Sequence, residues 1–411
     1  MRILGLSFLF LAHAASLHAE GNDSLRMAVI SVMERGANYS SAILLDEHGM
    51  ARGDYNIVEG KWSPYEPAWH TGQIIYGLVE AYRITGKKEY LQQAQRAGMW
   101  WKGLVIKDNP KLNGMLRTIH GGGIEKICFT TLCDCANGIF ELWRETKDSS
   151  YAATATTAGE WALKTMYLPD EGMFYDFVDP VTGDVQRTWS DFWPDKKEQI
   201  LTDVARPNNE GYLYKDMFEF TGNERYRKVF IDLCESVLRR QGPEGLWMEF
   251  TPNNKAAGTF HSRFNLWYAE SLLEGFELTG DKRYLNAAVK TLRFYTKFQK
   301  KDGTIHYVNY VNGTTIENSP SGSTIAFAGM LWLRLLKSGA GEEFRENIER
   351  SFRWVMTNRY SEEHPDRNLA GGFYNVRMSV KKGKQSLVQR DIGTPFGLRF
   401  LAEYYRWKFL R

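Results

Sequence analysis

The sequence has few cysteines, little excess charge and, after its first residues, no long apolar run. Four cysteines in 411 residues are too few for a secreted scaffold held together by disulfides. The 52 Lys and Arg against 49 Asp and Glu give a formal charge of only +3, which excludes a general nucleic-acid binder. No later segment reaches the roughly 20 apolar residues that span a bilayer. What remains, with 43% hydrophobic and 25% charged residues, is the composition of a globular protein.

The first residues have the pattern of a secretory signal peptide. Met1 and Arg2 precede an apolar run over residues 3–15, and small residues follow around residues 17–19. Such charged, apolar and small-residue regions are removed on export. We therefore expect residues 1–19 to be a signal peptide, residues 20–411 to form one catalytic domain, and the protein to be secreted or periplasmic.

The cysteines are unevenly placed at Cys128, Cys133, Cys135 and Cys234. Two Cys-x-x-Cys pairs, or Cys pairs combined with His pairs, are the usual spacings of zinc ligands, and neither occurs here. We expect buried thiols or one disulfide, and we predict no metal and no cofactor.

The strongest pattern in the chain is a repeated helix–turn–helix signal. An apolar helical pattern ends in a short turn, and a new helical pattern starts with Tyr or Phe about four residues later. Five copies centre on Gly86, Lys147, Gly222, Gly280 and Gly339, which lie 61, 75, 58 and 59 residues apart. Glycine suits the left-handed end of a helix, and the Asp, Asn or Ser that follows can begin the next one. Each copy is therefore predicted to be a helical hairpin.

A sixth helix pair can be drawn from Asp23–Arg35 and Pro395–Phe409. Six hairpins in a closed ring make an all-α toroid of the (α/α)6 type, whereas an open ring would be a helical solenoid that binds peptides. Solenoid repeats are short and regular, but the connectors here are long, uneven and rich in Gly, Trp, Asn and Tyr. We therefore favour the toroid, with short β-hairpins and a cleft at the one mouth where the connectors gather. The connectors are Asp54–Trp69, Gly103–Gly123, Asp170–Asn209, Gly242–Asn265, Asp302–Ser323 and Glu362–Thr394.

Aromatic residues make up 14% of the chain and often stand where a connector meets a helix. Flat rings with one polar edge suit the faces of sugars, although large aromatics also fill the cores of helical proteins. We take Trp69, Trp189 and Trp267, together with His120 in a glycine-rich connector, as candidate substrate-binding residues.

Two helix starts are unusually polar. Residues 206–210 read Arg-Pro-Asn-Asn-Glu, and the later start carries His261, Arg263, Asn265 and Tyr268. If the helix includes all of the second segment, then His261, Asn265 and Tyr268 lie on one face. Cleavage of a uronate polymer by β-elimination needs cations or amides on the sugar carboxylate and a base for the C5 proton. A tyrosine can be that base when positive charge lowers its pKa.

This pattern resembles the toroidal polysaccharide lyases that act on alginate and other uronate polymers. Asn208 and Asn209 match the two Asn positions of the family motif, although Asn208 can also be a simple helix cap. Glu210 stands where the family has His, and it would repel a uronate unless it were protonated or paired with Arg206. The resemblance implies Tyr268 as base and acid, and it implies that the carboxylate is held and oriented by Arg263, His261, Asn208, Asn209 and Glu210, with Arg206 and Asn265 alongside.

A second segment pair is similar to the unsaturated glucuronyl hydrolases, which share a toroid of this size. Asp134 shortly before Asn137, and the Ser- and Ala-rich helix start at residues 319–328, carry this similarity. Hydrolysis needs a carboxyl acid and usually a second carboxylate, for which Asp134 and Glu249 are candidates. Asp134 can also be a helix N-cap.

We therefore predict a monomeric lyase that cleaves a uronate-containing polysaccharide, with no nucleic-acid or membrane partner. A glycoside hydrolase of the unsaturated uronyl type is the alternative. A sugar epimerase on the same ring and a non-enzymatic glycan-binding repeat protein are further alternatives.

Overall fold

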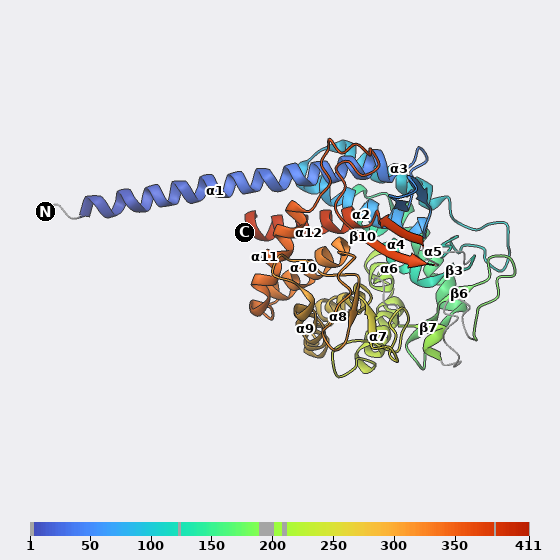
Figure 1. The fold of residues 1–411 in the computed structure, drawn as a ribbon. Helices are drawn as coiled ribbons and strands as arrows, with labels where there is room; N and C mark the ends of the chain where they lie inside the picture. Colours follow the sequence, from blue (N-terminus) through green and yellow to red (C-terminus); the bar gives the residue numbers. More distant parts are fainter. Residues whose placement is uncertain (1–3, 122–124, 189–200, 208–211, 382–383, 411) are drawn as a thin grey trace.

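The computed structural model describes residues 4–121, 125–188, 201–207, 212–381 and 384–410. Its twelve described α-helices alternate between the outer and the inner layer of a ring (Figure 1). The outer helices are α1 (Leu4–Tyr39), α3 (Lys88–Lys102), α5 (Ser149–Thr165), α7 (Glu224–Arg239), α9 (Lys282–Tyr295) and α11 (Arg345–Thr357). The inner helices are α2 (Pro67–Thr85), α4 (Phe129–Thr146), α6 (Leu213–Thr221), α8 (Phe264–Thr279), α10 (Gly322–Lys337) and α12 (Gly393–Phe409).

The turns between paired helices have the predicted chemistry. Gly86, Gly222 and Gly280 end α2, α6 and α8 with φ values of 72°, 70° and 74°, which glycine adopts without a Cβ clash. At the next helix starts, the side chains of Asp148, Asn223 and Asp281 each accept a hydrogen bond from a backbone N–H of the first turn. The predicted hairpins are confirmed.

The ring closes where the last helix meets the first two. α12 packs against α2 and α1, and Arg26 Nε donates a 2.8 Å hydrogen bond to the Tyr405 hydroxyl. The all-α (α/α)6 toroid is therefore confirmed. α1 begins at Leu4 and projects beyond the ring (Figure 1), and the signal peptide at residues 1–19 stays a prediction. Of the helices described here, none is both long and apolar enough to cross a membrane.

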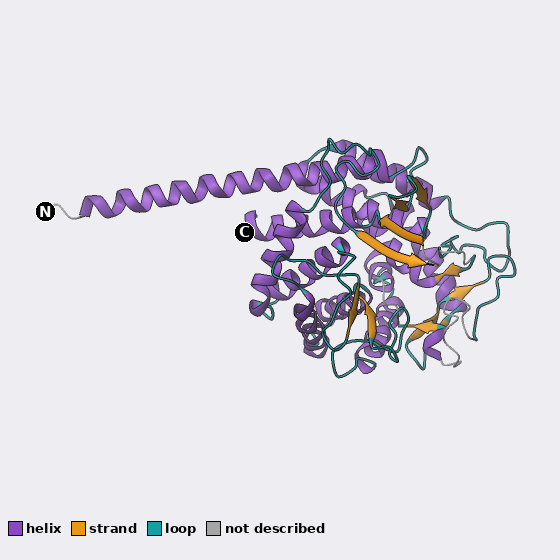
Figure 2. Cartoon of the chain, in the orientation of Figure 1, coloured by secondary structure: helices purple, strands orange, loops and turns teal. Residues whose placement is uncertain are grey.

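The connectors contain short antiparallel strands (Figure 2). The largest sheet has the order β10-β11-β1-β2 and joins the first connector to the last, with Tyr55 opposite both Gln389 and Trp62. Its strands are β10 (Val376–Lys381), β11 (Lys384–Gln389), β1 (Asp54–Asn56) and β2 (Lys61–Ser63). The smaller sheets pair β3 (Ile127–Cys128) with β6 (Phe177–Val178), β5 (Met173–Tyr175) with both β4 (Tyr167–Leu168) and β7 (Ala205–Arg206), and β8 (Thr259–His261) with β9 (Val308–Tyr310).

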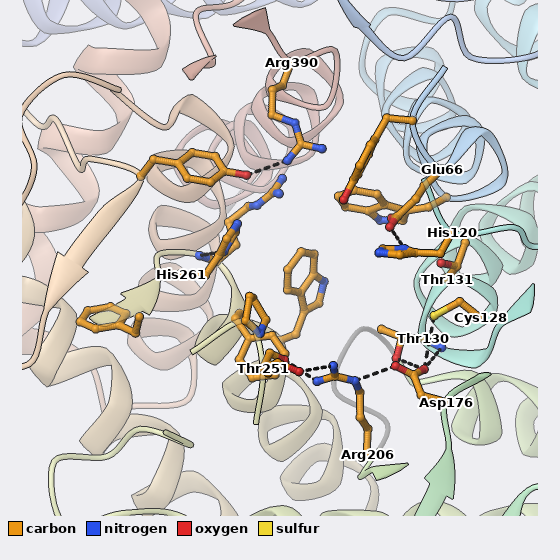
Figure 3. A pocket seen from close by; sticks show the side chains of 18 of the residues that line it. Glu66, His120, Cys128, Thr130, Thr131, Asp176, Arg206, Thr251, His261 and Arg390 are labelled. Carbon is orange, nitrogen blue, oxygen red and sulfur yellow. Dashed lines mark hydrogen bonds and ion pairs between the residues drawn. The ribbon is translucent and has the colours of Figure 1, made fainter. Parts of the chain in front are cut away.

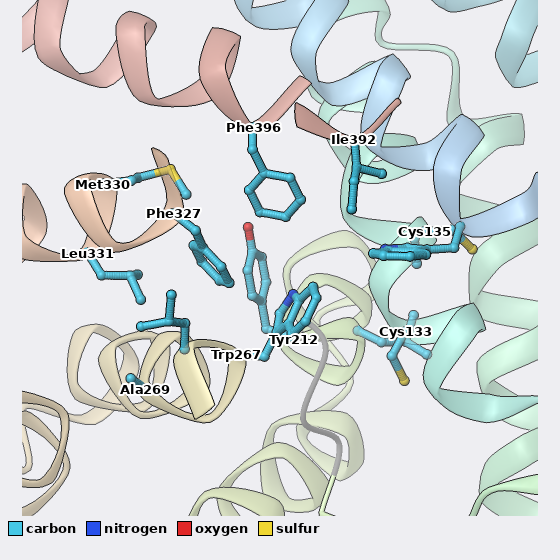
Figure 4. Close-up of a cluster of buried hydrophobic side chains, with 14 of the residues drawn as sticks. Cys133, Cys135, Tyr212, Trp267, Ala269, Phe327, Met330, Leu331, Ile392 and Phe396 are labelled. Atoms are coloured by element: carbon cyan, nitrogen blue, oxygen red, sulfur yellow. The ribbon is translucent and has the colours of Figure 1, made fainter. Parts of the chain in front are cut away.

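Aromatic side chains fill the centre of the ring (Figure 4). The Trp267 ring lies 5.6 Å from that of Phe327 and 6.3 Å from that of Phe396, centroid to centroid. The thiols of Cys133 and Cys135 are buried in the same core, and all four cysteines are free, as one of our two expectations had it. This packed core fills the centre of the ring below the mouth where the inner helices begin.

Candidate active site

A cavity of about 350 Å³ opens at the mouth where the inner helices begin (Figure 3). Every one of the six connectors contributes to its lining, which confirms that they gather at one mouth. The volume suits one or two sugar units. The lining includes Tyr65, Glu66, Trp69, His120, Asp176, Arg206, Thr251, His261, Arg263, Trp267, Tyr307, Arg377 and Arg390.

Two tryptophans and an arginine form one part of the wall. The rings of Trp69 and Trp267 meet edge to face with centroids 6.1 Å apart. The Arg263 guanidinium lies 5.4 Å from each of these centroids, and its Nη1 donates a 3.2 Å hydrogen bond to Ser323 Oγ. Aromatic faces beside a buried cation suit a sugar ring that carries an anionic group.

Positive charge surrounds Tyr307 at this end of the cavity. Arg390 Nη1 donates a 2.6 Å hydrogen bond to the Tyr307 hydroxyl, while Arg390 Nε donates to both carboxylate oxygens of Asp54, at 3.1 and 3.0 Å. The Arg377 guanidinium lies 5.4 Å from the Tyr307 ring centroid. Burial alone would raise the Tyr307 pKa, but Arg390, Arg263 and Arg377 together hold it below its usual value. This end of the cavity therefore favours negative charge.

His261 sits against Tyr307 as a neutral hydrogen-bonding group. Its ring meets that of Tyr307 edge to face at 4.7 Å. Burial, followed by the nearby arginines Arg263, Arg390 and Arg377, lowers the His261 pKa far below its usual value. Because His261 Nδ1 accepts a 3.2 Å hydrogen bond from the Arg263 backbone N–H, the neutral ring carries its proton on Nε2.

An ion pair between Asp176 and Arg206 forms part of the opposite wall (Figure 3). Arg206 Nε donates to Asp176 Oδ2 at 2.7 Å, and Asp176 Oδ1 accepts from the hydroxyl and backbone N–H of Thr130, at 2.6 and 3.0 Å. Burial alone would raise the Asp176 pKa, but the Arg206 charge and these hydrogen bonds hold it below its usual value. Asp176 is therefore a well-bonded, ionised carboxylate.

Glu66 and His120 form a second polar pair on this side (Figure 3). Glu66 lies in the first connector, directly before Pro67 at the start of α2, and its carboxylate contacts His120 Nδ1 from the second connector. Burial lowers the His120 pKa to about 4, so the imidazole is neutral near pH 7.

Asp54, His70 and Asp391 are close enough together to suggest a metal site in the described part of the chain, with ligand atoms within 4.8 Å of one another. However, the His70 Nδ1 contacts Asp391 Oδ1 at 2.6 Å, and the Arg390 guanidinium already neutralises Asp54. A cation here would face that guanidinium directly. The three side chains therefore fit an internal charge network and do not fit a metal ion.

Six of the predicted residues meet in the cavity. They are Trp69, His120, Arg206, His261, Arg263 and Trp267. They come from four different connectors and the helix starts that follow, which explains why residue type and position near an inner helix were sufficient to find them.

Tyr268 and Asn265 do not line the cavity, which corrects the predicted grouping. Tyr268 is fully buried, with its ring 4.8 Å from that of Trp247, and Asn265 Oδ1 accepts a 2.9 Å hydrogen bond from the Trp247 backbone N–H. The prediction assumed one helix from His261 onwards. Because α8 begins only at Phe264 and His261 belongs to β8, the helical spacing does not apply across the two elements.

The two predicted hydrolase acids also lie away from the cavity. Asp134 is fully buried in α4 and accepts a 2.9 Å hydrogen bond from Gln73 Nε2, whereas Glu249 is half exposed and pairs with Lys255 at 3.3 Å. The remaining predicted residues, Trp189, Asn208, Asn209 and Glu210, lie outside the described residues.

Sequence reasoning missed Glu66, Asp176, Tyr307, Arg377 and Arg390. All five stand in the connectors, but charged residues and tyrosines are common there. Only Glu66 had a local signal, because it directly precedes the proline that starts an inner helix.

Comparison with known proteins shows which enzymes have a similar fold. The family described as Glycosyl Hydrolase Family 88 matches residues 50–196, about a third of the chain. No curated protein matches the chain in sequence. An unsaturated glucuronyl hydrolase from Bacillus sp. GL1 is similar in structure, with a TM-score of 0.67 and 13% identity, covering 92% of this chain and 96% of that one.

Two further carbohydrate-active proteins are also similar in structure. A cellobiose 2-epimerase from Bacillus thermoamylovorans has a TM-score of 0.68 and 15% identity over 92% of this chain and 99% of its own. A polysaccharide lyase has a TM-score of 0.59 and 14% identity over 93% of this chain and 98% of its own. The chain therefore has the toroidal fold of these carbohydrate-active enzymes, and the family match favours glycoside hydrolysis over the lyase chemistry that we predicted.

Proposed function

We propose that the protein is a glycoside hydrolase acting on an oligosaccharide that carries a uronate. The observation that carries this proposal is the composition of one cavity. Tryptophan faces and an arginine-rich end lie on one side, and two carboxyl groups lie on the other. The match of residues 50–196 to a glycoside hydrolase family supports the same chemistry.

Substrate binding follows from the two kinds of side chain at the arginine end. A sugar ring stacks on Trp69 or Trp267, and its carboxylate is held by Arg263, Arg377 and Arg390. Guanidinium groups bind carboxylates through paired, charge-assisted hydrogen bonds, which gives both affinity and orientation. Neutral His261 adds a donor for a sugar hydroxyl.

Glycoside hydrolysis needs a carboxyl group to transfer a proton at the scissile bond. Among the described residues that line the cavity, Glu66 and Asp176 are the two carboxyl groups. Glu66 and Asp176 therefore replace Asp134 and Glu249 as the candidate hydrolytic carboxyl groups.

β-Elimination is a second candidate because of one observation. Tyr307 lines the cavity, and three arginines lower its pKa, as a tyrosine base for the C5 proton requires. In that case Tyr307 takes the role that we had predicted for Tyr268.

One assay separates the two reactions. Mature protein is incubated with alginate, glucuronan, ulvan, pectate and glycosaminoglycans, and separately with pre-made unsaturated oligosaccharides of each polymer. Ultraviolet absorbance then follows the C4–C5 double bond of the unsaturated uronate. We expect this absorbance to decrease on one set of unsaturated oligosaccharides, with release of the terminal sugar. An increase on a polymer would establish the lyase instead.

We further propose that the protein acts after export, as the apolar run over residues 3–15 suggests. Expression in a bacterial host followed by N-terminal sequencing of the extracytoplasmic fraction tests this. The expected first residue is near Glu20.

A further inference from the structure

The backbone of Glu66 is strained at the edge of the cavity. Its φ and ψ are 46° and 58°, in the left-handed region that side chains with a Cβ rarely adopt. Lys147 is the other non-glycine residue with positive φ in the described part of the chain, and it ends a helix, where this conformation is common. Glu66 instead begins a helix, and its side chain makes no capping hydrogen bond. Helix capping therefore does not account for the strain.

Neighbouring groups lock this backbone in place and aim the side chain. The carbonyl oxygen of Glu66 accepts a 3.1 Å hydrogen bond from the His70 N–H of α2, which holds this conformation even though the following Pro67 favours an extended one. The Glu66 side chain, 7% exposed, reaches the cavity and contacts His120 from another connector (Figure 3). Strain that places a carboxyl group in a cavity is typical of functional residues.

Asp176, the other carboxyl group of the cavity, already accepts hydrogen bonds through both of its oxygens. Asp176 Oδ1 accepts from Thr130 and from Cys128 Sγ, and Asp176 Oδ2 accepts from Arg206. Protonation of Asp176 would weaken its ion pair with Arg206 and these hydrogen bonds, which together hold its pKa below the usual value. Asp176 is therefore suited to positioning Arg206 and the start of α4.

We infer that Glu66 is the catalytic proton donor of this cavity and that His120 is the residue that positions it. This inference rests on the proposed hydrolase function. The Glu66 carboxyl gives its proton to the leaving oxygen as the bond between that oxygen and the sugar carbon breaks. The oxygen of a water molecule then bonds to the carbon, and the water returns one proton to Glu66. The sum is hydrolysis, and Glu66 ends in its starting state.

The first test replaces the carboxyl group and keeps its shape. In Glu66→Gln, the side chain still fills its place beside His120 but cannot transfer a proton. We expect kcat on the substrate found in the absorbance screen to fall by about 100-fold or more, with KM changed less than about threefold. The matched control is Glu249→Gln, whose carboxylate is half exposed and pairs with Lys255 outside the cavity. Its kcat should equal that of the wild type.

A second variant distinguishes catalysis from a structural role. Glycine adopts positive φ without strain, so Glu66→Gly should melt at the wild-type temperature or above it while losing activity as Glu66→Gln does. A residue that served only to hold the cavity together would melt lower when reduced to glycine.

The outcomes separate the two proposals. If the wild type hydrolyses a substrate and Glu66→Gln keeps more than about a third of its kcat, then Glu66 is not the proton donor and the hydrolase proposal stands. If the wild type hydrolyses none of the unsaturated oligosaccharides, or only generates the double bond, then the hydrolase proposal fails and the role of Glu66 fails with it.

Discussion

At the scale of single residues, the cavity is divided by charge. Arg377 and Arg390 flank Tyr307 at one end, whereas the arginine of the other wall, Arg206, is fully engaged by Asp176 and Thr251. Arg377 differs from the others because its side chain, on β10, is exposed at the mouth. A substrate carboxylate can therefore reach Arg377 without displacing Asp54 from Arg390 or Asp176 from Arg206.

Arg377→Ala should weaken substrate binding and leave the chemical step alone. A charge-assisted hydrogen bond contributes about 1.5 to 3 kcal/mol, so we expect KM to rise about tenfold or more at unchanged kcat. Arg377→Lys keeps the charge and loses the two-pronged geometry, and its KM should lie in between. Steady-state kinetics on the uronate substrate measure both values. An unchanged KM for Arg377→Ala would show that the carboxylate binds elsewhere.

The sequence could predict those site residues that stand next to an inner helix. Trp69, His261, Arg263 and Trp267 were found because bulky or basic residues precede or open α2 and α8. Tyr307 could not be found in this way, because the arginines that hold its pKa below the usual tyrosine value stand up to 83 residues away. Tyr268 was grouped with His261 because their spacing would place both on one face of a helix. That spacing applies only from Phe264 onwards, where α8 begins.

At the scale of elements, local signals carried the prediction of the helical hairpins. A helix end and the next helix start lie a few residues apart, so glycine and the capping residues at Asp148, Asn223 and Asp281 define each turn without help from the rest of the chain. The spacing between inner helices has no such signal. α2 and α4 approach closely because Gly138 faces the backbone of Gly72, and Gly72 faces the backbone of Cys135.

Gly138→Ala should therefore disrupt the fold. A Cβ at this position would lie 1.9 Å from the Gly72 carbonyl oxygen, and backbone cannot move aside as a side chain can. We expect a loss of about 3 kcal/mol or more in the free energy of unfolding, or no soluble protein. Gly222→Ala is the control, because nothing lies within 4 Å of its added Cβ and only the positive φ opposes it, at about 1 kcal/mol. Urea unfolding measures both. Equal losses would contradict the close approach of α2 and α4.

At the scale of the whole molecule, the two mouths of the toroid differ, because one holds the open cavity and the other holds a ring of ion pairs. The inner helices begin around the open cavity, but at the opposite mouth neighbouring inner helices are joined by ion pairs that run around the complete ring. The pairs are Arg83 with Glu141, Arg144 with Asp216, Lys215 with Glu274, Glu274 with Arg334, Lys337 with Glu403, and Arg406 with Glu80. Each pair joins one inner helix to the next. Networks of this kind hold elements in register more effectively than isolated surface pairs do.

One carboxyl group inside this charged mouth should make stability depend on pH. Glu270 is 2% exposed, and its Oε1 accepts a 3.4 Å hydrogen bond from Arg399 Nη2. Burial raises the Glu270 pKa to about 7, although Arg399 and Arg334 oppose the shift. The unfolded chain has a value near 4.3, so the folded protein binds an extra proton between these two values. Stability from this group is therefore present below about pH 4 and is lost as pH rises through about 7.

Glu270→Gln should remove this pH dependence, because glutamine resembles the protonated side chain and does not ionise. Relative to the wild type, the variant should become more stable by about 3 to 4 kcal/mol between pH 4 and pH 8, since the shift from 4.3 to about 7 corresponds to about 1.4 kcal/mol for each pKa unit. Urea unfolding of both proteins at several pH values gives this difference, in which the other titrating groups cancel. Glu343→Gln, which alters an exposed pair with Arg293 on the outer layer, should show no comparable trend. A constant difference between Glu270→Gln and the wild type would mean that Glu270 is ionised throughout, and that the ion-pair ring extends to the centre of the toroid.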